Sequence, residues 1–262
     1  MKRTAAAASA LVLVLVLVVP GGALAAPPEG PPIVPSGDER SASTLQLGEE
    51  LFAANCVRCH GIGGRGITGG DDPRLRGPSL RGVGALAADF YLRTGYMPLA
   101  DATKQPVRSR PRFDDREIRA LIAYVASLRP GPGVPRPDPA AGSVAEGREL
   151  FTEHCAGCHQ VVAEGGVMPG AKAPPLGRAT PRQVAEAVRI GPYVMPTFSK
   201  SDITDAQLNS IIAYVQYAKD PDDAGGWGIN HLGPFPEGMV VWLMAIPLLL
   251  LVCRAIGRRV SS

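Results

Sequence analysis

Apolar side chains recur at helical spacing in two segments of the chain. Four apolar residues in each segment lie at positions i, i+3, i+4 and i+7, namely Ile118, Leu121, Ile122 and Val125 in the first, and Leu208, Ile211, Ile212 and Val215 in the second. This spacing predicts one amphipathic helix in each segment, with its apolar face directed at a core.

Helix start signals predict further helices around these two. Four pairs have the form of a capping box, in which a small polar cap is followed three residues later by a carboxyl or amide side chain: Ser43-x-x-Gln46, Asp114-x-x-Glu117, Ser143-x-x-Glu146 and Thr204-x-x-Gln207. Thr180 and Pro181 start a middle helix that runs through Ile190, and residues 86–94 occupy the same place in the first segment. Glycine-rich loops connect the helices, and no strand is predicted.

The two segments are copies of one unit. Residues 48–52 read GEELF and residues 147–151 read GRELF, an offset of 99. The offset is 98 between Met97 and Met195 and 90 between the last helices, so the first copy carries about eight extra residues after Met97, within 99–112. The pattern predicts an all-α fold with two tandem domains, at 43–128 and 143–220.

Proline-rich stretches flank the first domain. Residues 26–42 and 129–142 have this composition, which is typical of semi-rigid extended linkers. Before them, residues 1–25 combine Lys2 and Arg3 with an apolar run and end in Ala-Leu-Ala. This arrangement predicts a secretory signal peptide, with an uncleaved N-terminal anchor as the alternative.

The C-terminal region predicts a membrane anchor. Residues 238–257 are almost wholly apolar, except for Arg254, and follow a juxtamembrane segment at 221–237. They predict one transmembrane helix, followed by a short tail at 258–262 that carries Arg258 and Arg259. The arginine excess predicts that the tail is cytoplasmic and that both domains are extracytoplasmic.

Each copy contains the pentapeptide Cys-x-x-Cys-His. Its chemistry-bearing residues are Cys56, Cys59 and His60 in the first copy, and Cys155, Cys158 and His159 in the second. The fifth cysteine, Cys253, lies in the apolar C-terminal run. No cysteine therefore remains for a framework of disulfides.

Three kinds of site use Cys-x-x-Cys: a redox-active dithiol, half of a zinc site, and the thioether anchors of a c-type haem. Residues at i, i+3 and i+4 lie on one face of a helical turn, so two sulfurs can bond a porphyrin edge while the imidazole reaches iron. A dithiol does not require the histidine, and zinc requires a fourth ligand. The motif therefore favours two covalently bound haem c groups, which would also supply buried surface to domains of only about 80 residues.

A methionine follows each motif at a matching distance. Met97 lies 37 residues after His60, Met195 lies 36 residues after His159, and a proline follows each methionine. Thioether ligation opposite histidine raises the potential of haem iron, which suits an electron carrier. We therefore expect both methionines to be axial ligands, and treat Met168, nine residues after His159, as a surface or packing residue.

Charge adds less. The formal net charge is +3, which gives no reason to expect a nucleic-acid partner. Residues 65–112 contain nine Lys or Arg against four Asp or Glu, whereas residues 145–219 contain seven of each. The basic stretch is either a solvated surface that offsets haem propionates or a docking face for an acidic redox partner.

Together these features resemble the dihaem cytochrome c subunit of the actinobacterial cytochrome bc1 complex, often called cytochrome cc. The resemblance covers the chain from residue 45 onward and rests on the two haem motifs, the two Met-Pro sites, GPSL at 77–80, and LGPFPEGM at 232–239 before the final helix. It implies two class I cytochrome c domains followed by a C-terminal transmembrane helix.

The resemblance also implies a function and partners. The chain would be an electron-transfer subunit of a menaquinol:cytochrome c reductase, receiving electrons from a Rieske iron-sulfur subunit beside cytochrome b. It would pass them to the copper-site subunit of a terminal cytochrome c oxidase. The family resemblance implies that a Pro-x-Leu carbonyl holds each ligand imidazole, a pattern that Pro78 and Pro174 match.

Two other functions stay open at this point. The chain could be an enzyme in its own right, such as a dihaem peroxidase or a sulfur-oxidising cytochrome, although catalytic haem needs an open or displaceable position and both copies offer a methionine. It could instead be the dihaem subunit of another complex, such as a cbb3-type oxidase or a membrane dehydrogenase. The segment at 232–239 argues against this second reading.

Overall fold

The computed structural model describes residues 41–221 and 234–260. The chain divides into two compact units between Val134 and Pro135, and each unit is described by itself. The predicted signal segment at 1–25, most of the first linker and most of the juxtamembrane segment lie outside the described residues, as do the last two residues of the tail.

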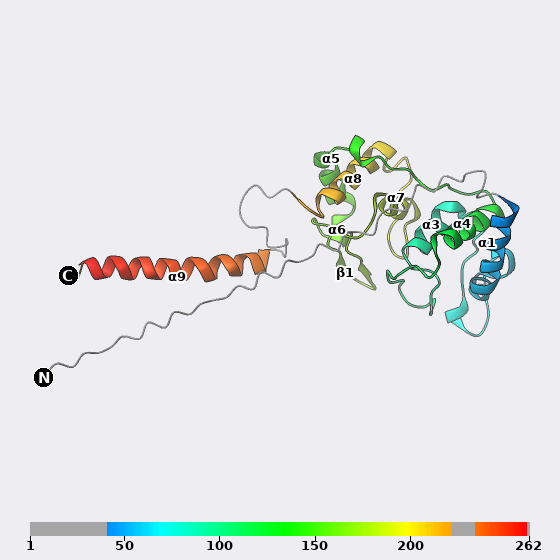
Figure 1. Cartoon of the computed structure of the whole chain (residues 1–262), viewed down its shortest axis with the longest axis horizontal. Helices are drawn as coiled ribbons and strands as arrows, with labels where there is room; N and C mark the ends of the chain where they lie inside the picture. The colour runs from blue at the N-terminus through cyan, green and yellow to red at the C-terminus, as the bar shows by residue number, and fades with distance from the viewer. Residues whose placement is uncertain (1–40, 222–233, 261–262) are drawn as a thin grey trace. The chain divides into compact units, whose positions relative to one another are not determined.

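Unit 1 is built from helices (Figure 1). In chain order they are α1 (Ala42–Asn55), α2 (Val57–His60), the 3-10 turns η2 (Ile62–Gly64) and η3 (Pro73–Leu75), α3 (Gly84–Arg93) and α4 (Asp115–Leu128). Helix α4 packs on both α1 and α3. Its predicted apolar face is confirmed, since Ile118, Leu121, Ile122 and Val125 are all buried in one cluster with Phe52.

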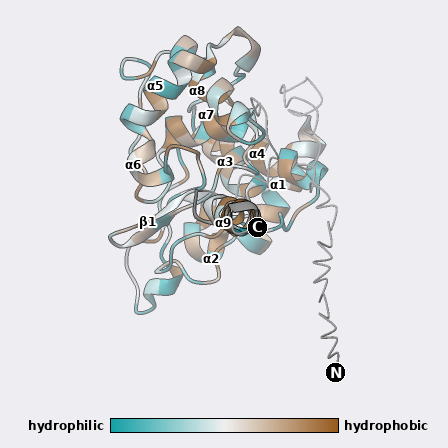
Figure 2. Ribbon diagram, turned by 90° about the vertical axis from the view of Figure 1, so that its left-hand side faces the viewer, coloured by the Kyte–Doolittle hydropathy of each residue, from teal (hydrophilic) through white to brown (hydrophobic). Residues whose placement is uncertain are grey.

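Unit 2 repeats this arrangement. Its elements are η4 (Pro139–Ala141), α5 (Val144–His154), α6 (Ala156–His159), β1 (Gly166–Met168), β2 (Ala171–Ala173), α7 (Pro181–Ile190) and α8 (Asp205–Tyr217). Helix α8 packs on α5, and its predicted apolar face lies in a cluster with Phe151. Figure 2 shows that the helices of both units carry hydrophobic and hydrophilic residues side by side, as amphipathic helices do.

The first and last helices of each unit touch at a glycine. A Cβ on Gly48 would meet the Ala120 carbonyl, and one on Gly147 would meet the Ser210 carbonyl. Four residues later a phenylalanine packs on a tyrosine of the last helix, with ring centroids 5.2 Å apart for Phe52 and Tyr124. The corresponding distance in unit 2 is 5.4 Å, so the repeated GEELF and GRELF stretches mark the same helix crossing.

Most of the helix starts agree with the sequence. The capping boxes at Asp114 and Thr204 are confirmed, and Thr180 forms a third one before Pro181. Ser143 caps α5 as predicted, although the Glu146 carboxylate accepts from Ser210 Oγ at 2.7 Å instead of returning to the cap.

The predicted start at Ser43 is wrong. Helix α1 begins at Ala42 because Ser41 Oγ accepts a hydrogen bond from the Thr44 backbone N–H at 3.2 Å, so Ser41 is the cap. Helix α3 likewise begins two residues earlier than predicted, at Gly84.

The expectation that strands are absent is also wrong. Strands β1 and β2 form an antiparallel hairpin in which Gly166 pairs with Ala173. In unit 1 the equivalent contact is a single bridge between Ile67 and Gly77. Strands of three residues are too short for an alternating pattern, so the sequence carried no signal for them.

The stretch at 129–142 is not a free spacer along its whole length. Its start packs on unit 1, where the Leu86 N–H donates to the Pro132 carbonyl at 3.2 Å. Its end packs on unit 2, where the Asp138 N–H donates to Asn209 Oδ1 at 2.9 Å and η4 follows. Proline composition predicted an extended chain but not these anchoring contacts.

Helix α9 (Pro234–Val260) is longer than the predicted span at 238–257. Pro234 and Pro236 lie in its first turn, where the missing N–H groups have no helical partner to lose, and the helix continues through Pro247. Residues Gly238–Arg258 are long and apolar enough to cross a membrane, and none of this span is buried within the chain. The C-terminal helix therefore fits a membrane anchor.

The glycine crossing generates a stability prediction. Gly147→Ala should destabilise unit 2 by about 1–3 kcal/mol, because the new Cβ must displace the α8 backbone or Tyr214, whose Cβ would lie 2.9 Å away. Thermal unfolding of the detergent-solubilised chain measures the change. Gly177→Ala is the control, since a Cβ at Gly177 meets nothing within 4 Å. Equal melting of the two variants would contradict a packing role for Gly147.

Candidate haem-binding sites

Each Cys-x-x-Cys-His pentapeptide forms a tight helical turn at the end of the first helix. In unit 1, Cys56 links α1 to α2, and its carbonyl accepts the N–H groups of Cys59 at 3.1 Å and His60 at 2.9 Å. The equivalent bonds in unit 2 measure 3.1 Å and 2.9 Å. The two thiols and the imidazole of each motif therefore lie on one face of a turn.

The two histidines are buried and held by prolyl carbonyls. His60 and His159 are each 9% exposed. Nδ1 of His60 lies 2.8 Å from the Pro78 carbonyl oxygen, and Nδ1 of His159 lies 3.1 Å from that of Pro174. A carbonyl can only accept, so Nδ1 is the donor in both bonds. In a neutral ring this leaves the lone pair on Nε2, the nitrogen that would bind iron.

The loops that carry these prolines fold back on the histidine turn in both units. In unit 1 the Gly66 N–H donates to the His60 carbonyl at 2.7 Å, and Leu80 donates to the Gly64 carbonyl at 2.8 Å. Gly77 has no room for a side chain, because its Cβ would lie 2.7 Å from the Cys59 carbonyl oxygen and 3.1 Å from His60 Nδ1. In unit 2 the hairpin brings Pro174 to the same place.

Burial changes the acid–base behaviour of these groups. It raises the pKa of the Cys56 thiol to about 11, with a smaller contribution from neighbouring Cys59. The pKa of Cys155 is also raised to about 11, for the same reasons. Burial lowers the pKa of His159, against the opposing effect of its bond to Pro174. Burial thus favours the neutral thiol at Cys56 and Cys155 and the neutral ring at His159.

The structure also places the two methionines. Met195 borders the apolar cluster of unit 2, as do Cys155 and Leu176, so the methionine segment and the haem-motif turn pack on the same core. Its N–H donates to the Pro192 carbonyl at 3.1 Å. In unit 1 the partly buried Met97 donates its N–H to the Tyr91 carbonyl at 3.1 Å, just beyond the end of α3.

These residues fit a covalently attached haem better than the alternatives. None of the four motif cysteines is in a disulfide, and each is half-buried beside a histidine with an oriented ring. Within residues 41–221 and 234–260, no three His, Cys, Asp or Glu side chains gather as ligands of a metal ion. The chain therefore lacks, in its described part, the four-ligand cluster that a structural zinc site requires.

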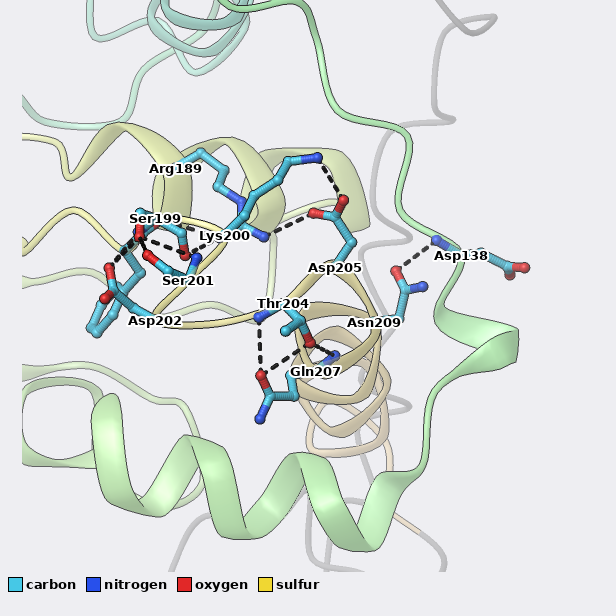
Figure 3. Close-up of polar contacts among 11 residues, drawn as sticks. Asp138, Arg189, Ser199, Lys200, Ser201, Asp202, Thr204, Asp205, Gln207 and Asn209 are labelled. Carbon is cyan, nitrogen blue, oxygen red and sulfur yellow. Dashed lines mark hydrogen bonds and ion pairs between the residues drawn. The ribbon is translucent and has the colours of Figure 1, made fainter.

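Sequence reasoning missed a pair of arginine bridges. Near the end of the middle helix, Arg93 binds Asp115 in unit 1 at 2.8 Å and Arg189 binds Asp205 in unit 2 at 2.9 Å. Figure 3 shows the unit 2 bridge, with Lys200 on the other carboxylate oxygen of Asp205. An aspartate directly after the cap of each last helix was the available signal, since Asp115 and Asp205 match at the offset of 90.

Comparisons with known proteins agree with this geometry. The family models Cytochrome c and Cytochrome C oxidase, cbb3-type, subunit III match residues 45–129 and 142–215. A cytochrome bc1 complex cytochrome c subunit of Mycobacterium tuberculosis is 37% identical over 237 residues, which cover 86% of this chain and 81% of the relative. The chain belongs to the family of cytochrome bc1 complex cytochrome c subunits. A Corynebacterium diphtheriae member is 33% identical, with 86% of this chain and 85% of the relative covered.

More distant similarities extend beyond this family. The cbb3-type cytochrome c oxidase subunit CcoP of Azospirillum sp. is 31% identical over 189 residues, covering 64% of this chain and 60% of the relative. A solved chain of the reducing HAO-like protein complex of Kuenenia stuttgartiensis covers 66% of this chain at 16% identity with a TM-score of 0.37, too low to establish a shared fold. Family membership and the two cytochrome c domains identify covalently bound haem c as the cofactor.

Proposed function

We propose that this chain is the membrane-anchored dihaem cytochrome c subunit of a menaquinol:cytochrome c reductase. The observation that carries the proposal is the duplicated site, in which each Cys-x-x-Cys-His turn holds a buried imidazole on a prolyl carbonyl. Two such sites in one chain of this family support two electron-transfer centres, one in each unit.

The roles of the residues follow from their chemistry. Cys56 and Cys59 attach one haem c through thioether bonds, and Cys155 and Cys158 attach the other. His60 and His159 would each give an iron its nitrogen ligand, with ring orientation held by Pro78 and Pro174. Met97 and Met195 would each give the same irons a thioether ligand. When bound, each haem iron supplies a one-electron couple, and the thioether ligand raises its potential.

The proposed location and partners follow from the anchor and the family. Helix α9 holds the chain in the cell membrane, with its arginine-rich end in the cytoplasm and both haem units on the extracytoplasmic side. The bc1 name of the relatives supports cytochrome b and Rieske iron-sulfur subunits as partners upstream. A copper-site subunit of cytochrome c oxidase is the proposed acceptor. The chain itself then contributes no substrate-transforming site.

A second candidate function has its own support. The cbb3-type subunit III model covers residues 142–215 of unit 2, and the Azospirillum relative is named as a subunit of such an oxidase. This favours an electron-transfer subunit of an oxidase as the alternative. The identity and coverage of the bc1 relatives are both higher, so the reductase subunit is the stronger proposal.

Co-purification distinguishes the two candidates. A tagged full-length chain, extracted from its own membranes in a mild detergent, should bring cytochrome b and a Rieske subunit with it, as mass spectrometry of the eluate will show. A catalytic oxidase subunit without cytochrome b would favour the alternative. Recovery without either set would contradict the proposed place in a quinol pathway.

Haem stoichiometry tests the attachment sites. The purified chain should carry two haems that follow the polypeptide through denaturing electrophoresis, because thioether bonds survive unfolding. Replacing Cys56 and Cys59 by Ala should leave one haem per chain, measured by pyridine haemochrome absorbance against protein mass. Cys253→Ala, in α9, is the control and should retain two. Two haems in the double variant would exclude the first motif as an attachment site.

Redox titration tests the methionine ligands. Met97→His and Met195→His should each keep both haems attached and lower the reduction potential of one haem only. Axial ligands change haem potentials over a range of ~0.8 V, and the decrease should be at least a tenth of that range. Electrons cross the two centres in series, so either variant should also slow quinol-driven oxygen uptake in membranes.

The control for this titration is Met168→His, because Met168 lies in β1 on the histidine side of unit 2. It should leave both potentials unchanged. Unchanged potentials in the Met97 and Met195 variants would remove the ligand assignment. Lowered potentials with normal oxygen uptake would keep the ligands but contradict a series pathway.

A further inference from the structure

The methionine segment of unit 2 is a closed loop between α7 and α8. Thr197 Oγ1 donates to the Ile190 carbonyl at 2.9 Å, and the Phe198 N–H donates to the Val188 carbonyl at 2.9 Å. Gly191 starts the loop in the left-handed region, with φ at 63°, and leaves no space for a Cβ against Thr197. Met195 therefore lies inside a loop whose two ends are fastened to the last turns of α7.

Arg189 joins the exit of this loop to α8. Its Nη1 donates to the Phe198 carbonyl at 3.1 Å and to the Ser199 carbonyl at 2.9 Å, while Nη2 donates to Asp205 Oδ1 at 2.9 Å (Figure 3). The side chain is only 11% exposed. A guanidinium is a planar fork of fixed donors, so three acceptors at once hold it in one orientation.

Lys200 lies in the loop itself, directly after Ser199, and binds the same carboxylate, but among the described residues its Nζ donates to no main-chain carbonyl. Its Nζ lies 2.6 Å from Asp205 Oδ2, and its side chain is 74% exposed. An exposed ion pair of this kind contributes little to stability. Arg189 thus differs from Lys200 in two ways: it binds the two carbonyls at the loop exit, and its side chain is largely buried.

Unit 1 closes its methionine segment in a different way. Arg93 donates to Asp89 and Asp115, both at 2.8 Å, and within the described residues it binds no carbonyl of the segment after Met97. The closure comes instead from Ser109, near the end of the extra residues in this copy. Its Oγ donates to the Gly95 carbonyl at 2.7 Å, and its N–H donates to the Thr94 carbonyl at 3.2 Å.

We propose that Arg189 is the positioning residue of the methionine loop in unit 2, holding the loop exit against α8 so that the Met195 thioether stays at the iron. This rests on the proposed assignment of Met195 as an axial ligand. Arg189 acts through the loop and does not touch the iron. Because Ser109 performs the closure in unit 1, loss of Arg189 loosens the ligand of one haem and spares the other.

The test uses the full-length dihaem chain in detergent. Ferric haem with histidine and methionine ligands has a weak near-infrared absorption band, and each of the two haems should contribute about half of it. Arg189→Gln should therefore lose about half of this band. It should also lower the potential of one haem and let the reduced protein bind carbon monoxide at that haem. Arg189→Lys keeps the charge but not the fork, so it should restore part of the band.

Two controls separate positioning from general effects of charge and stability. Lys200→Gln should keep the whole band and both potentials, since Lys200 shares Asp205 with Arg189 but donates to no main-chain carbonyl in the part of the chain that the structure describes. Val215→Ala should lower the melting temperature of unit 2 through its buried core and still keep the band. An intact band in Arg189→Gln, even with a lowered melting temperature, would overturn the proposal.

Two further measurements keep the outcome decisive. If Arg189→Gln does not accumulate with two haems, Arg189→Lys carries the test, and an unchanged band and potentials in that variant would overturn the proposal. Met195→His is measured in parallel. A full band in Met195→His would contradict the assignment of Met195 as a ligand, and with it the role of Arg189. A reduced band in Met195→His together with a full band in Arg189→Gln would contradict the role of Arg189 alone.

Discussion

The close approach of two helix backbones at a glycine is the contact on which each unit depends. Gly48 and Gly147 let the first helix lie directly on the last, and the phenylalanine one turn later fills the crossing. The first cysteine of each motif follows the glycine by eight residues, a little over two helical turns or about 12 Å along the axis. The crossing point therefore determines where the thiols and the histidine emerge relative to the core.

Much of this architecture could be predicted because the local signals were strong and agreed with one another. Asp114 and Thr204 cap the last helices as expected, and the four-residue apolar faces of those helices are buried. The duplication gave each signal twice, which strengthened the placement of the cysteine and histidine turns. The carbonyls of Pro78 and Pro174, which the Pro-x-Leu pattern singled out, lie beside the imidazoles of His60 and His159.

The features that escaped prediction depend on tertiary contacts. Ser41 is the cap in place of Ser43, a difference of two residues that the local sequence does not decide. The hairpin at Gly166–Ala173 follows from how the loop closes over Cys158, and the anchoring of Asp138 depends on Asn209, which lies 71 residues away. The arginine bridges are of the same kind, since their partners lie 22 and 16 positions apart in the chain.

Holding the imidazole on a main-chain carbonyl has an evolutionary consequence. A side-chain acceptor is lost by a single codon change, but every amino acid at position 78 or 174 brings a carbonyl with it. Replacement of the proline would loosen φ and add an N–H, without deleting the acceptor. The ring orientation is thus insensitive to which side chain occupies position 78 or 174. Selection acts instead on the path of the loop backbone, which in unit 1 can approach the histidine turn because Gly77 has no side chain.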